Sequence, residues 1–154
     1  MNSKSMANSM YEQLCNGRSP FAFAKLCGTE VFPSVRGEVS FYDTPVGVLF
    51  KANIKGFPRC ESNSSSAKAY NFCLRKDGEL CRSAHGERGK AICIGLPTVY
   101  ERCGEASCMA VTKRIDPSEL EGKILIVHER LGDIESSCTQ RLAVAKGRVE
   151  YIGA

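Results

Sequence analysis

The chain has 154 residues, of which 43% are hydrophobic and 25% are charged, so it is long enough for one domain with a sizeable core. The net charge of +4 is modest, and the lysines and arginines form no run, which disfavours nucleic acid as a partner. No apolar run reaches the length of a membrane span, and residues 1–8 lack the apolar stretch of a secretory signal. These features predict a cytoplasmic protein that engages neither nucleic acid nor a membrane; the alternative is a secreted protein whose signal has been removed.

The numbers of cysteines and histidines limit which disulfides and metal sites the chain can form. Nine cysteines are many for this length, and an odd number cannot pair completely within one chain. Their spacing contains no Cys-x-x-Cys, which argues against a zinc finger or a thioredoxin-type motif. Small buried thiols in a reducing cytosol account for most of them. The two histidines, His85 and His128, are too few for a site that needs many imidazoles.

Residues 1–20 are polar and without a clear period, apart from a helical turn predicted near 11–14, so we expect a flexible N-terminal extension there. From residue 21 onward, short apolar–polar alternations are separated by turn residues, which is the pattern of strands. Asp116 and Pro117 suit the cap and first position of a single helical turn. The strands are predicted near 21–27, 35–42, 48–55, 69–74, 98–103, 107–112, 123–129 and 141–151. This pattern predicts an all-β sandwich or barrel over 21–154.

The strand at 70–74 is the centre of the candidate site. Its alternation puts Tyr70 and Phe72 on one face and Asn71 and Cys73 on the other. Two short polar side chains two residues apart on a strand point the same way. In a β protein, such a pair can supply two ligands of one metal ion. The alternative is a strand with an ordinary polar face. In the strand at 123–129, His128 shares a face with two isoleucines.

Four segments, in this order and spacing, resemble the copper/zinc superoxide dismutase family, in particular its bacterial, Clostridium-like members. Segment 35–58 resembles the family's first hairpin and its Gly-Leu-Pro ending. Residues 70–74, followed by Cys81, resemble the Phe-His-x-His-Glu segment and its following cysteine. Residues 121–129 resemble the strand that ends in Val/Ile-His, and residues 140–147 resemble the closing Arg/Lys-Ile/Leu-Ala-Cys-Gly. The resemblance implies an eight-stranded antiparallel Greek-key β-sandwich or barrel of the immunoglobulin-like, superoxide dismutase-like type.

The resemblance also implies where the copper ligands should fall. The two copper histidines of the central strand are replaced by Asn71 and Cys73, the bridging histidine falls on His85, and the last copper histidine falls on His128. Arg141 matches the basic residue at the family's copper channel, where it would steer superoxide in a working enzyme. Most of the metal ligands are therefore replaced.

The zinc subsite and the disulfide also depart from the family. No residue matches the zinc ligands, and Gly95 stands where the family has an aspartate, so zinc is not expected at the usual subsite. The family's disulfide cysteine matches Cys81, but its usual partner position is Val144. Cys138 is the first candidate to replace that partner and Cys60 is the other, and a free thiol at Cys81 is an equal alternative to either disulfide.

Coordination chemistry narrows what the replaced site could hold. Asn71 is a poor copper ligand, and a Cys73 thiolate is soft, favours Cu(I) and would tend to be oxidised by Cu(II). Cys73, His85 and His128 could together form a three-ligand Cu(I) or Zn(II) site. The alternative is that no metal binds, with Cys73 as a buried thiol and both histidines in ordinary roles.

These observations predict a superoxide dismutase-like protein with a degraded copper/zinc site, little or no dismutase activity, and a binding or structural role. One alternative is copper or zinc binding through Cys73, His85 and His128, and another is an atypical copper-only superoxide dismutase. The expected cofactor is copper or none. Expected partners are a metal ion, a second copy of the chain in a homodimer, or another protein.

Overall fold

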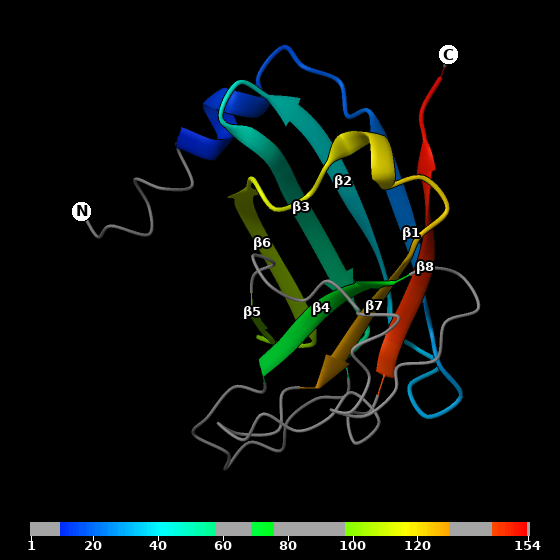
Figure 1. The fold of residues 1–154 in the computed structure, drawn as a ribbon. Coiled ribbons are helices and arrows are strands. Elements are labelled where there is room, and N and C mark those ends of the chain that lie inside the picture. Colours follow the sequence, from blue (N-terminus) through cyan, green and yellow to red (C-terminus); the bar gives the residue numbers. More distant parts are fainter. Residues whose placement is uncertain (1–9, 58–68, 76–97, 130–142, 154) are drawn as a thin grey trace.

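The fold is all-β, as predicted, and is seen in a computed structural model that describes residues 10–57, 69–75, 98–129 and 143–153 (Figure 1). Each predicted strand is present, with ends that differ by a few residues from those expected. The strands are β1 (Ala22–Gly28), β2 (Arg36–Thr44), β3 (Gly47–Lys55), β4 (Ala69–Arg75), β5 (Thr98–Tyr100), β6 (Glu105–Thr112), β7 (Ile124–Glu129) and β8 (Ala143–Tyr151).

All eight strands belong to one antiparallel sheet with the order β5-β4-β7-β8-β1-β2-β3-β6. The two end strands of this order, β5 and β6, are consecutive in the chain and lie in contact with each other, so the sheet nearly closes into a barrel. After β4, β5 and β6, the chain returns so that β7 pairs with β4, which is the connection of a Greek key. The Greek key places β4 and β7 side by side.

The interior of the barrel is filled by the inward-facing residues of each strand, which alternate with outward-facing ones. On β1 the residues Ala22, Ala24 and Leu26 are buried, and the residues between them face outward. Aromatic rings from three strands meet in the middle, where Phe50 makes edge-to-face contacts with Phe41 and Phe72 at centroid distances of 5.6 and 4.8 Å. Such rings contribute both buried area and a preferred geometry, so they help to fix the register of the strands.

The predicted helical turn is present as a 3-10 turn, η1 (Pro117–Glu119). The Asp116 carboxylate accepts hydrogen bonds from the backbone N–H of Ser118 at 3.0 Å and from its hydroxyl at 2.8 Å. Tyr151 of β8 donates a hydrogen bond to the carbonyl of Pro117, which ties the turn to the barrel. No helix in the described ranges is long and apolar enough to cross a membrane.

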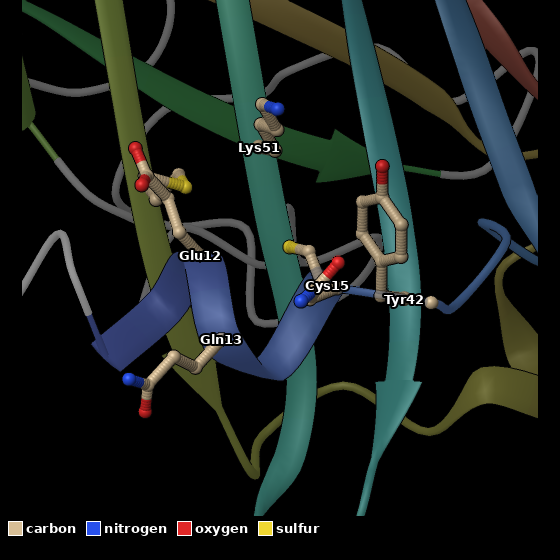
Figure 2. Close-up of a pocket in the computed structure, with 8 residues that line it drawn as sticks. Glu12, Gln13, Cys15, Tyr42 and Lys51 are labelled. Carbon is tan, nitrogen blue, oxygen red and sulfur yellow. The ribbon is translucent and has the colours of Figure 1, made fainter.

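Before the barrel, residues 10–15 are helical, which confirms the predicted helical turn in this region. The helical segment lies across the outer face of β2, β3 and β6 (Figure 2). Leu49 alternates with the core residues Val48 and Phe50, and it is itself 0% exposed although it is not part of the core cluster. Arg18 also donates a hydrogen bond to the Asp43 carbonyl at 3.2 Å. The expected flexible extension over 1–20 therefore contacts the barrel from residue 10 onward, and residues 1–9 lie outside the described part.

Candidate functional site

The candidate site is built by the pairing of β4 with β7. Asn71 lies directly opposite His128, and Cys73 lies directly opposite Ile126. The residues between them, Phe72 and Val127, are opposite each other and fill the core. Because side chains alternate across a strand, Asn71, Cys73 and His128 all point to the outer side of the sheet. The structure therefore brings these three residues together on one side of the sheet, whereas His85, the fourth residue of the expected site, lies outside the described residues.

The closest contact in the site joins Cys73 and His128. The His128 Nε2 atom lies 2.9 Å from the Cys73 Sγ atom, and the residues are only 4% and 1% exposed. The contact is a diagonal one, between positions two residues apart in register on neighbouring strands, which lie within reach of an imidazole. The second ring nitrogen of His128, Nδ1, is also buried and makes no hydrogen bond to the described part of the chain.

The chemical state of Cys73 differs from the expectation. Cys73 was predicted as a free thiol or a thiolate ligand, but it is disulfide-bonded. Its partner is not among the other described cysteines, which are all free: Cys15, Cys27, Cys103 and Cys108. A disulfide sulfur carries no hydrogen and can only accept, so the Nε2 atom of His128 must be the donor in this contact. The sequence could not reveal this state, because nine irregularly spaced cysteines do not specify their pairing.

Asn71 is engaged on its other side by the edge strand. Thr98 of β5 lies opposite Asn71, and the Thr98 hydroxyl donates a hydrogen bond to the Asn71 Oδ1 atom at 2.7 Å. This oxygen is the atom that a metal would otherwise use. Sequence reasoning missed Thr98, because a contact between β4 and β5 becomes visible only once the register of the two strands is known.

The remaining predicted site residues lie outside the described ranges. They are His85 and Arg141, together with the cysteines of the expected disulfide, Cys81 and Cys138, and the alternative partner Cys60. Their roles stay predictions. The described site therefore consists of Asn71, Cys73, Thr98 and His128.

The donors of this site do not fit copper or zinc. They are one imidazole, one disulfide sulfur and one amide oxygen that already accepts a hydrogen bond. Both metals prefer imidazole nitrogen or thiolate sulfur, and a stable zinc site takes at least three protein ligands. No group of three His, Cys, Asp or Glu residues in the described ranges is arranged to hold a metal ion. A metal would need Cys73 to be reduced and at least one further ligand.

A hollow lies beneath the helical segment, with a volume of about 510 Å³ (Figure 2). Its lining includes Glu12 and Cys15 from the segment and Tyr42 and Lys51 from the sheet. Burial raises the pKa of the Cys15 thiol, the positive charge of Lys51 lowers it, and Glu12 raises it further. Because the pKa is raised overall, Cys15 carries less thiolate at neutral pH than an ordinary cysteine, which makes it a poor nucleophile.

Comparison with known proteins finds no protein-family model and no curated protein that matches the chain. The resemblance to copper/zinc superoxide dismutases therefore depends on the four sequence segments, and it stays a prediction.

Proposed function

We propose that the chain is a superoxide dismutase-like β-barrel that does not dismutate superoxide and that serves a binding or structural role. The observation that carries this proposal is the buried contact between a disulfide-bonded Cys73 and His128 at the position where the resemblance puts copper ligands. A disulfide in this position supplies a covalent cross-link in place of a metal ligand.

Dismutation requires a metal that alternates between two oxidation states and keeps one position open for the anion. Imidazoles support both Cu(I) and Cu(II), whereas here only His128 supplies one among the described residues. The amide oxygen of Asn71 is bound by Thr98, and a reduced Cys73 would itself be oxidised by Cu(II). Redox cycling of copper at this site is therefore disfavoured whether Cys73 is disulfide-bonded or reduced.

The test is a metal analysis of protein purified without chelator, followed by copper loading and a superoxide assay. We expect substoichiometric copper and a turnover far below that of a working dismutase, before and after loading. Turnover by the copper-loaded protein near the diffusional range, about 10⁸–10⁹ M⁻¹s⁻¹, would contradict the proposal. Loss of such turnover in His128→Ala would then identify the copper site.

The short distance between Cys73 and His128 favours a second candidate function, in which the reduced protein binds Cu(I) or Zn(II). Reduction would leave a thiol sulfur next to an imidazole nitrogen, and His85 is the candidate third ligand. Cu(I) titration of the reduced protein, compared with Cys73→Ser and His128→Ala, tests this role. Equal affinity in the parent and both variants would remove these residues from any metal site.

A further inference from the structure

Four exposed side chains form a row across the outer face of the barrel, on four neighbouring strands. Lys146 of β8 lies opposite Cys27 of β1, Cys27 lies opposite Arg36 of β2, and Arg36 lies opposite Lys55 of β3. All four are exposed. We call this set the basic row. Since neighbouring strands are about 4.8 Å apart, the row spans roughly 14 Å.

The surface beside the basic row has the same sign of charge. Lys25 and Arg148 are exposed on β1 and β8, two positions along from Cys27 and Lys146. Within two positions of the basic row along the strands, the acidic residues are Glu38, opposite Lys25, and Glu105, opposite Lys55 at the end of the row. The region therefore carries five basic and two acidic side chains, which is a large share of the net charge of +4.

Electrostatic energy within the row is unfavourable in the isolated protein. Arg36 and Lys55 are directly opposite each other, and like charges in such a pair destabilise a sheet. Glu105 offsets part of this repulsion for Lys55, but Arg36 has the uncharged Cys27 on its other side. An anionic partner placed over the row would remove the repulsion and gain attraction to each cation.

The chemistry of the surface distinguishes between classes of anionic partner. Single-stranded nucleic acid is bound through aromatic side chains that stack on the bases, and neither the basic row nor the neighbouring positions carry an aromatic residue. A membrane surface would call for several protruding apolar side chains beside the basic ones, whereas Val31, between β1 and β2, is the one large exposed apolar residue near the row in the described part of the chain. The outer face of the sheet also carries Glu38 and Asn53 beside the cations, and their side-chain oxygens can accept hydrogen bonds from backbone N–H groups.

We propose that the basic row, Lys146-Cys27-Arg36-Lys55, docks an acidic segment of a partner protein. The inference rests on the proposed binding role of the chain, and it gives that role a surface and a class of partner. It does not involve Asn71, Cys73 or His128, so an active dismutase site would leave it intact.

The test uses the full chain and a fluorescent decaglutamate peptide, followed by anisotropy at about 0.02 M and about 0.15 M salt. We expect binding that weakens with salt. Arg36→Glu together with Lys146→Glu should weaken it by roughly tenfold, because two exposed attractions become repulsions. The matched control is Arg114→Glu, an exposed arginine in the segment after β6, which should bind the peptide almost as the parent does.

Two further readouts separate docking from a structural role. Arg36→Glu alone creates an opposite-charge pair with Lys55, so its melting temperature should rise by roughly 1–3 °C while peptide binding falls. Bound peptide should slow the alkylation of Cys27 but not that of Cys103, which is exposed beyond the acidic end of the row. Equal loss of binding in Arg114→Glu, unprotected Cys27, or tighter binding of an oligodeoxythymidylate or of phosphatidylserine vesicles would overturn the proposal.

Discussion

The Nε2 atom of His128 lies 2.9 Å from the Sγ atom of Cys73, although the two residues are 55 positions apart in the sequence. The contact exists because β4 and β7 pair in a register that sets Asn71, not Cys73, directly opposite His128. A disulfide sulfur can only accept a hydrogen bond, so the buried imidazole must donate its N–H to the sulfur, and this defines the orientation of the ring. The pair therefore fixes the packing of β4 on β7 from the outer side, while Phe72 and Val127 fix it from the core.

The disulfide of Cys73 should contribute strongly to stability. We expect Cys73→Ser to lower the free energy of unfolding by about 2–4 kcal/mol, because the unfolded chain loses a cross-link. Denaturant unfolding without reductant measures the change. Cys27→Ser is the matched control, since Cys27 is free and exposed, and it should change stability by less than about 0.5 kcal/mol. Equal stability of Cys73→Ser and the parent would contradict a cross-link that stabilises the fold.

Restoring imidazoles should create the copper site that the resemblance predicts for this face. In Asn71→His with Cys73→His, two new imidazoles would share the outer side of β4 with His128 of β7. We expect stoichiometric Cu(II) binding, visible by electron paramagnetic resonance, that the parent lacks. Adding His128→Ala should abolish most of the signal. Cu(II) binding that is unchanged by His128→Ala would mean that the three positions do not converge on one ion.

Much of the fold was predictable, because the strands carry a clear alternation. Phe41 faces inward between Ser40 and Tyr42, and Asp116 caps its turn by a purely local hydrogen bond. The common outward direction of Asn71 and Cys73 followed from the same alternation. The oxidation of Cys73 and the hydrogen bond from Thr98 did not, because both depend on partners that are distant in the sequence. The docking of residues 10–15 was also not predictable, since so short a helix has no period that could reveal a buried face.

Two glycines with the same backbone conformation should respond differently to alanine. Gly56 and Gly122 have φ values of +82° and +84°, where a Cβ is strained in any case. A Cβ at Gly56 would also collide with the carbonyl oxygen of Ser34, whereas at Gly122 nothing lies within 4 Å. We expect Gly122→Ala to cost about 1 kcal/mol and Gly56→Ala about 3 kcal/mol or more, as measured by urea unfolding. Similar costs would show that the chain near Ser34 moves freely.

Cys108 should make the stability of the protein sensitive to alkaline pH. Burial raises the pKa of its thiol to about 12 from an ordinary 9.0, and a hydrogen bond with the backbone of Ala52 opposes part of the shift. Below pH 9 the thiol is protonated in both the folded and the unfolded chain. Above pH 9 the unfolded thiol ionises first, which lowers the free energy of the unfolded state, so folding stability is lost as the pH rises toward 12.

The difference between the parent and Cys108→Ala isolates this effect from the titration of lysines and tyrosines. Between pH 7 and about pH 10.5 the parent should lose roughly 2 kcal/mol more of its unfolding free energy than Cys108→Ala does, because the unfolded thiol is then largely ionised. Cys27→Ala, at an exposed position, should follow the parent. In the folded protein at pH 8, iodoacetamide should label Cys27 much faster than Cys108, since only the thiolate reacts. Parallel pH profiles for the parent and Cys108→Ala would show that Cys108 ionises equally in both states and that its burial does not hold the proton.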